Sequence, residues 1–179
     1  MENRIANIII QTPGGTAAKG SSTYKVSLPS SWVKELGITA EDRQIELSFD
    51  GTSITISKRL NLQQFIETRK AKGHQLILLS YFDNQTMCSQ IAADDTGHSL
   101  CVENYTSDVL RTAFGNNRAP TWDDFQAFLE ERCIPRNRAG LREYLEAIGL
   151  EEYDPLEIIK KTSGRMAEDH QWLKVKVIK

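Results

Sequence analysis

The sequence predicts an α+β fold in which a strand-rich N-terminal part precedes a small antiparallel meander and a C-terminal helical region. Three observations carry this prediction. Apolar and polar residues alternate between residues 24 and 57, apart from one short helical segment. Three further short apolar or alternating runs, separated by turn residues, occupy residues 75–83, 86–94 and 99–105. From Asp108 onward the apolar residues recur with the period of a helix.

The first helix lies between two predicted strands of the N-terminal part. Pro29 cannot continue the preceding strand, and Ser30 or Ser31 is expected to cap the first free N–H groups of the helix. Gly37 supplies the left-handed residue that ends it about two turns later. The sequence therefore predicts a short helix between residues 30 and 37.

A β-hairpin is predicted directly after this helix, because apolar residues alternate on both sides of Asp50-Gly51. That dipeptide suits the positive φ angles of a two-residue type I′ turn. About forty residues with three short strands and a two-turn helix bury too little apolar surface to fold alone. We expect the same strands of a second copy to complete this part of the chain.

The remaining elements predict the domain organisation. Residues 61–73 are expected to form a helix that ends at Gly73 and connects the two parts, so that the predicted divisions are 1–60, 61–74 and 75–179. Thr121 with Asp124 predicts one C-terminal helix start, and Asp154 with Pro155 predicts another. The alternating tail, WLKVKVIK, is expected to pair as a strand.

Charge and composition exclude several classes of protein. The formal net charge of -2 predicts no strong attraction to polyanions over the whole surface, so a basic function is sought in residues 1–60, with seven Lys or Arg against six Asp or Glu. The three cysteines and three histidines lie far apart, so we expect no metal site, no disulfide scaffold and no cofactor. We expect no signal peptide and no membrane span, which indicates a reducing, cytoplasmic setting.

A phosphate-binding loop is the first alternative for the glycine-rich N-terminal segment. Gly15 and Gly20 are four residues apart and two serines follow, but Lys19 precedes the second glycine instead of following it. The residues after this segment alternate as in a strand, whereas a phosphate loop leads into a helix. A nucleotide triphosphate site is therefore not expected.

Residues 15–59 resemble the AbrB/MazE swapped-hairpin DNA-binding family, on the strength of the motif KGSSTYKVSLPSSWVKELGI and the hairpin that follows. The resemblance implies half of a β-barrel, completed by a second copy, that binds double-stranded DNA. The residues it implies at the DNA are Lys19, Ser21, Ser22, Lys25 and Lys34. Residues 39–43 depart from the family, because its turn glycine is missing there. Lysines at these points would neutralise phosphates and make the affinity sensitive to salt.

The C-terminal region offers two sets of candidate chemical residues. An arginine cluster around Cys133 could hold an anion or contact a partner, although nearby glutamates favour surface ion pairs: Arg132, Arg136, Arg138 and Arg142. Asp169 beside His170 could form an acid and base pair, but no nucleophile accompanies it. We read Cys133 as a buried structural cysteine. No catalytic residue is assigned, and the protein is not expected to be an enzyme.

Two functions remain open from the sequence. The first is a homodimeric bacterial transcription regulator, such as the antitoxin of a toxin–antitoxin pair, whose residues 75–179 hold a toxin or other effector. Residues 105–173 resemble small bacterial proteins associated with HipA-like toxins, which implies such a partner. The alternative is a protein-binding adaptor or inhibitor whose N-terminal part only dimerises, which the net negative charge favours.

Overall fold

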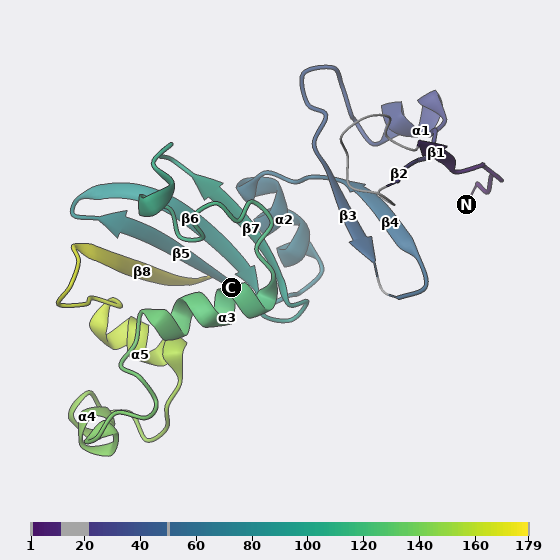
Figure 1. Ribbon diagram of the computed structural model, residues 1–179. Coiled ribbons are helices and arrows are strands. Elements are labelled where there is room, and N and C mark those ends of the chain that lie inside the picture. The colour runs from purple at the N-terminus through teal and green to yellow at the C-terminus, as the bar shows by residue number, and fades with distance from the viewer. Residues whose placement is uncertain (1, 12–21, 50, 179) are drawn as a thin grey trace. The chain divides into compact units, whose positions relative to one another are not determined.

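The computed structural model divides the chain into two compact units, Met1–Arg59 and Leu60–Lys179, which we call the first and second units (Figure 1). The structure describes residues 2–11, 22–49 and 51–178. Within these ranges it contains five α-helices and antiparallel sheets. The predicted class, a mixture of helices with antiparallel strands, is therefore confirmed. The described residues form no closed barrel.

The first unit contains two separate two-stranded antiparallel sheets. In one, β1 (Ile9–Gln11) pairs with β2 (Thr23–Lys25). In the other, β3 (Ile45–Phe49) pairs with β4 (Ile54–Lys58). The helix α1 (Ser30–Glu35) lies between β2 and β3 in the chain. The strand β1 is an addition to the sequence prediction, because three apolar residues are too short a run to show a period.

The hairpin of β3 and β4 confirms the predicted strands but corrects the turn. Phe49 pairs with Ile54, so four residues and not the two of a type I′ turn separate the paired strands, and Asp50 of the predicted turn lies outside the described residues. Gly51 does adopt a positive φ of 95°, as the prediction required of that position.

The helix α1 ends as predicted but begins differently. Gly37 has a φ of 65°, and its N–H donates to the carbonyl of Lys34 while that of Ile38 donates to Val33. This pair of bonds is a Schellman motif. At the other end neither serine caps the helix: the N-cap position is Pro29, without a side-chain hydrogen bond, and Ser30 is already helical.

The second unit is built on one antiparallel sheet of four strands in the order β7-β6-β5-β8. Its strands are β5 (Leu76–Asp83), β6 (Thr86–Asp94), β7 (Ser99–Asn104) and β8 (Gln171–Ile178). The first three are the predicted meander, and β8 is the predicted C-terminal strand. Figure 1 shows β8 beside β5 at one edge of the sheet, although about ninety residues separate them in the chain.

The helix α2 (Leu62–Ala71) covers one face of this sheet. It begins with a capping box in which Asn61 accepts from the N–H of Gln64 and the Gln64 side chain accepts from the N–H of Asn61. Leu62 and Phe65 are buried against the sheet, together with Leu76 of β5. The helix that was expected to connect the two parts thus packs into the second unit.

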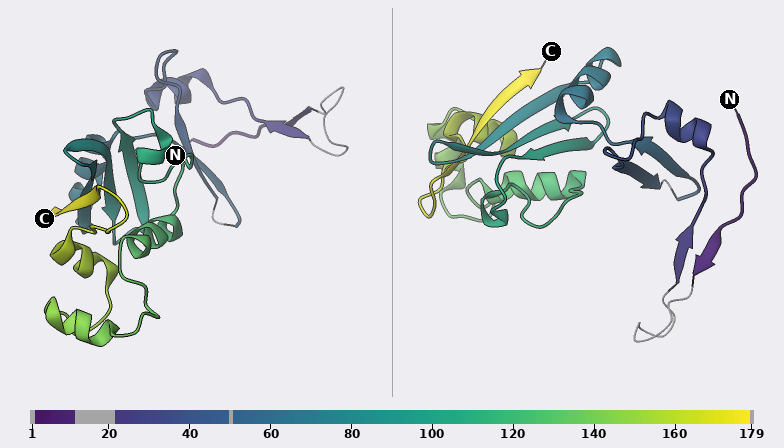
Figure 2. Two further views of the ribbon diagram at one scale, coloured as in Figure 1. Left: turned by 60° about the vertical axis from the view of Figure 1, so that its left-hand side comes forward. Right: turned by 90° about the horizontal axis from the view of Figure 1, so that it is seen from above.

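The opposite face carries the larger core. The helices α3 (Trp122–Glu131) and α5 (Pro155–Thr162) cover it, and the two views of Figure 2 place α2 and α3 on opposite sides of the sheet. Phe125 of α3, Ile159 of α5 and Leu79 of β5 are all nearly inaccessible to solvent. A 3-10 turn (Val109–Arg111) and the short helix α4 (Leu141–Ala147) complete the unit.

The helix starts of the second unit follow the sequence. Thr121 forms the predicted capping box with Asp124, and Asp154 accepts from the N–H of Glu157 one residue before Pro155 opens the next helix. Local side-chain chemistry determines these starts, which explains why they could be read without the fold.

Candidate functional site

The first unit has no interior of its own. None of its described residues is buried, and the strands β1, β2 and β3 are exposed along their whole length. The registers place Leu47 opposite Ile56 and Phe49 opposite Ile54, so one face of this hairpin is apolar. Leu47 is 63% exposed and Phe49 70%. Large apolar side chains on adjacent strands are seldom left in water, so this face needs a partner surface.

The smaller sheet shows the same deficiency. Ile10 pairs with Tyr24 across the β1 and β2 ladder, and both side chains are mostly exposed. Three residues on each side cannot hold such a ribbon together in water without packing on something else. Among the described residues of the first unit, neither sheet therefore has a covering layer.

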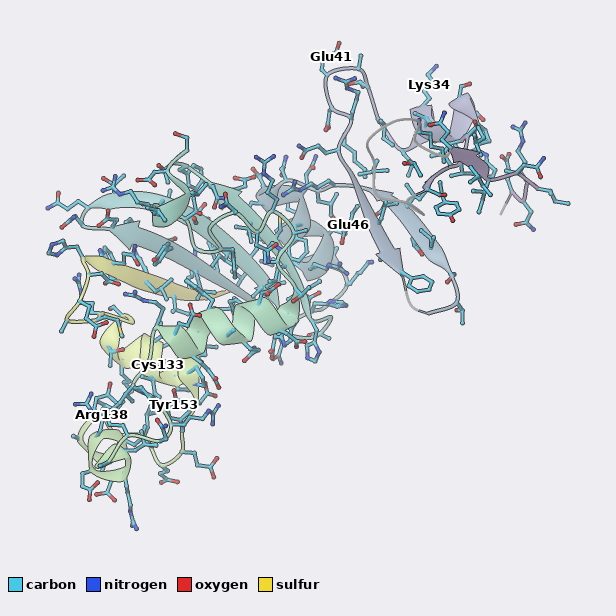
Figure 3. The ribbon with its side chains drawn as sticks, viewed as in Figure 1. Lys34, Glu41, Glu46, Cys133, Arg138 and Tyr153 are labelled. Carbon is cyan, nitrogen blue, oxygen red and sulfur yellow. The ribbon has the colours of Figure 1, made fainter. Side chains whose placement is uncertain are left out.

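The predicted DNA-facing lysines lie on these elements where the structure describes them. Lys25 is the last residue of β2 and is exposed, and Lys34 is exposed in the last turn of α1 (Figure 3). Ser22 precedes β2 and is half-buried. Lys19 and Ser21 fall outside the described residues. No ion pair involving Lys25 or Lys34 is present in the described part of the chain, so their charges are available to an external anion.

Residues 39–43, where the expected turn glycine is missing, form a turn that hydrogen bonds and an ion pair hold together. The N–H of Asp42 donates to Thr39 Oγ1 at 3.1 Å, and the N–H of Thr39 donates to the carbonyl of Asp42 at 3.1 Å. Lys58 of β4 binds Asp42 Oδ2 at 3.0 Å and the Gly37 carbonyl at 3.0 Å. Lys58 is thus a structural residue of the first unit that ties the end of α1 to the hairpin.

The four arginines around Cys133 do not converge on a shared site. Arg132 is buried and engages Asp169 at 2.6 and 3.1 Å. It also donates to the carbonyls of Gly164 and Gln171. These contacts use all of its donor nitrogens, so Arg132 joins the end of α3 to the loop before β8.

The other three arginines lie apart from it. Arg136 binds Glu130 at 2.7 Å and stacks over the ring of Tyr153, with 4.2 Å between the guanidinium carbon and the ring centroid. Arg142 pairs with Glu146 along the exposed face of α4. Arg138 lies in the loop before α4 (Figure 3). The surface ion pairs that the nearby glutamates suggested are therefore present for Arg136 and Arg142.

Asp169 and Cys133, the remaining candidates of the C-terminal region, both take part in contacts that stabilise the fold. The hydrogen bond from Arg132 is the main reason that the pKa of Asp169 lies below its ordinary value, and the N–H of Gln171 adds to it. Both oxygens of Asp169 therefore serve this ion pair. Burial raises the pKa of Cys133 to about 12, so its thiol stays protonated at neutral pH.

A polar cluster that the sequence analysis did not identify lies where α2 ends and β6 turns into β7. The side chain of Asp94 is fully buried and accepts from His74 Nδ1 at 2.8 Å. It also accepts from the N–H groups of Thr96 and Gly97 at 3.1 and 2.9 Å, and Arg69 Nε lies 3.4 Å away. Arg69 and His74 come from the end of α2 and the other residues from the turn between β6 and β7, so no single local motif predicts the whole cluster.

The electrostatics of Asp94 are those of a charged group held by its neighbours. Burial alone would raise the pKa of this carboxyl, but the hydrogen bonds from His74 and Gly97 and the charges of His74 and Arg69 outweigh it. The pKa of Asp94 is therefore below its ordinary value. A buried carboxylate with this many donors is a strong structural clamp.

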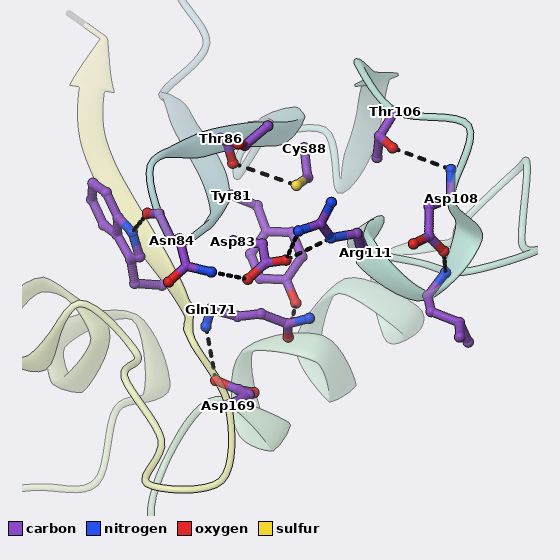
Figure 4. Close-up of polar contacts among 12 residues, drawn as sticks. Tyr81, Asp83, Asn84, Thr86, Cys88, Thr106, Asp108, Arg111, Asp169 and Gln171 are labelled. Carbon is purple, nitrogen blue, oxygen red and sulfur yellow. Dashed lines mark hydrogen bonds and ion pairs between the residues drawn. The ribbon is translucent and has the colours of Figure 1, made fainter.

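A second polar connection ties the far end of the sheet to the segment before α3. Arg111 donates to Asp83 through Nε at 2.6 Å and through its terminal nitrogen at 2.5 Å (Figure 4). Tyr81 Oη donates to the side chain of Gln171, which joins β5 to β8. These contacts join β5 to the 3-10 turn and to β8.

Within residues 2–11, 22–49 and 51–178, His, Cys, Asp and Glu side chains form no group of three or more that could hold a metal ion. In the same ranges no helix combines the length and the apolar character needed to cross a bilayer.

Three comparisons with known proteins add no family: no family model, no curated protein and no solved structure matches this chain significantly.

Proposed function

We propose that the protein is a homodimeric DNA-binding regulator of the AbrB-like swapped-hairpin type. The observation that carries the proposal is that none of the described residues of the first unit is buried, although its strands bear large apolar side chains. A second copy offers the same apolar faces and the same strand edges, and interleaving of the two copies would give both a common interior. The barrel implied by the family resemblance is such an arrangement.

The charges of the first unit support DNA as its ligand. Lys25 and Lys34 are exposed and carry no ion pair among the described contacts, whereas Lys58 is used within the unit. A homodimer presents each lysine twice around its two-fold axis, which suits a palindromic duplex site. Lysine contacts to phosphate supply affinity with little base discrimination, so sequence preference per subunit is modest.

The second unit is proposed to hold a protein partner, as in an antitoxin that binds both its promoter and its toxin. This part rests on the resemblance of residues 105–173 and on the separate core of the second unit. An adaptor whose first unit only dimerises is the second candidate. It is favoured by the net charge of -2, which leaves DNA attraction to a few local lysines.

The test is binding of the full-length protein to the DNA upstream of its own gene, with random DNA as competitor, at two salt concentrations. Specific binding that weakens with salt is expected. Lys25→Ala and Lys34→Ala should each weaken it and lower the slope of log affinity against log salt by about one per lost phosphate contact. Lys72→Ala, an exposed lysine of the second unit, is the matched control and should change neither.

Equal affinity for the upstream and random DNA would reject the regulator and select the adaptor. If specific binding is present but neither lysine variant alters the salt slope, the assignment of these two residues to the DNA surface is wrong.

A further inference from the structure

The strand β8 has one free edge. It pairs with β5 alone, in a regular antiparallel register, and no other described strand lies on its outer side. In such a ladder the backbone groups of successive residues point alternately toward and away from the partner strand. The N–H of Leu173 donates to the carbonyl of Ser163, at the end of α5, and therefore points away from β5. By the same alternation Val175 and Val177 also turn their N–H and C=O groups outward.

A groove runs beside this edge, between β8 and α5. One hollow of about 250 Å³ is lined by the β8 residues 172–175 together with Ile159 and Lys160 of α5. A second hollow of about 560 Å³ lies at the end of the sheet and is lined by Val177 and Ile178 together with Leu156 and Lys160. The rest of its lining comes from the end of α2, the start of β5 and the β6–β7 turn: Lys70, Gly73, His74, Gln75, Leu76, Ile77 and Asp95. Both hollows share Lys160 and follow the same strand, so we treat them as one feature, the β8–α5 groove.

The apolar part of the groove lies on the α5 side of the sheet. Val175 packs against the main core, whereas Val177 is 51% exposed. Leu156 lines the same hollow and is half-buried. An added strand would place every second side chain on this side, over Val177 and Leu156, where apolar groups would be covered.

Two lysines lie on the opposite face of β8, and their charge selects the kind of partner. Lys174 and Lys176 alternate with the valines and are exposed. A second copy of β8 pairing here would bring lysines close to lysines, and like charges on neighbouring strands destabilise a sheet. Glutamates or aspartates on the added strand would instead find opposite charges.

We propose that the β8–α5 groove binds an extended, acidic segment of a partner protein by strand addition. The segment pairs through its backbone with Val175 and Val177, covers Val177 and Leu156 with alternate apolar side chains, and directs its acidic side chains at Lys174 and Lys176. This deepens the part of the proposed function that assigns a partner to the second unit. It does not depend on DNA binding by the first.

The test uses the full-length protein and a fluorescent nine-residue peptide in which glutamate alternates with valine. Binding is measured by anisotropy, and amide shifts of Val175 and Val177 are followed by NMR. The same peptide with lysine in place of glutamate is expected to bind at least about tenfold more weakly, because the charges at Lys174 and Lys176 then repel. Methylation of alternate peptide nitrogens should also weaken binding about tenfold or more, because it removes the backbone donors.

Variants of the protein separate backbone pairing from side-chain contact. Val177→Pro removes one outward N–H on an edge strand, where proline is tolerated, and should lower affinity about tenfold. Val177→Ala keeps that N–H and should cost less. Lys174→Glu should weaken binding of the acidic peptide and strengthen binding of the lysine peptide.

Three results would overturn the proposal: no binding of the acidic peptide, equal binding of the methylated peptide, or intermolecular NOEs between the β8 strands of two copies. DNA binding is measured on the same preparations, because it tests the proposed regulator separately from the proposed strand addition at β8.

Discussion

At the scale of the residue, Arg132 is a buried side chain of the second unit whose three guanidinium nitrogens all donate hydrogen bonds. It lies 8% exposed, holds Asp169 bidentately and donates to the backbone carbonyls of Gly164 and Gln171. We expect Arg132→Met to lower the free energy of unfolding by about 3 kcal/mol, since it leaves Asp169 and these carbonyls without their donor. Chemical denaturation of the full-length protein measures this.

Arg142→Met is the matched control for that substitution. Arg142 pairs with Glu146 on the surface of α4 with its side chain 89% exposed, so the unfolding midpoint should hardly move. Equal effects of the two substitutions would show that burial and multiple bonding give Arg132 no special role.

At the scale of the element, the Asp94 cluster joins the end of α2 to the turn between β6 and β7. Because its neighbours hold the pKa of Asp94 below the ordinary 3.8, the carboxylate contributes stability above that pH. The contribution is lost as pH falls through the folded-state pKa, when the buried carboxyl takes up a proton. We expect Asp94→Asn to be destabilised relative to wild type at pH 6, with the difference shrinking below about pH 4.

Urea denaturation of both proteins between pH 2.5 and pH 7 measures that difference. Subtracting the unfolding free energy of the variant from that of wild type cancels the contributions of carboxylates that titrate in both proteins, including Asp169. A difference that stays constant across the range would mean that Asp94 contributes through shape and hydrogen bonding and not through its charge.

At the scale of the whole molecule, the proposed dimer would cover the apolar strand faces that the described residues of the first unit leave exposed. We expect Leu47→Asp to convert the dimer to monomer and to unfold the first unit, because a carboxylate would then lie inside the shared core. Sedimentation velocity measures the mass, and the two units should separate in a thermal scan. On a protein that is stable as a monomer, the same change at a 63% exposed position would be nearly neutral.

Thr55→Asp is the control for that experiment. It introduces the same charge in the same hairpin, on an exposed residue of β4 that pairs with Ser48 and so lies on the polar face. Dissociation by both variants would indicate that charge anywhere in the hairpin is harmful, and the apolar face would lose its special role.

The sequence by itself determined the local elements of this protein. Period-two runs predicted the meander and β8, and Thr121 and Asp154 predicted two helix starts, because such signals act over a few neighbouring residues. The sequence also predicted Lys25 and Lys34 as DNA-facing residues, although only through a family resemblance. The two-residue turn at Asp50-Gly51 and the serine cap of α1 were wrong, because turn length and cap geometry also depend on how the flanking strand or loop enters.

Only the tertiary structure decided what is brought together across the chain. His74 and Asp94 are 20 residues apart and meet because a strand pair carries β6 back beside the end of α2. Arg132 and Asp169 meet across 37 residues, which turned an arginine from a candidate anion ligand into a buried structural group. The free edge of β8 likewise follows from its place beside β5. Long-range contacts depend on packing of whole elements, which no local pattern encodes.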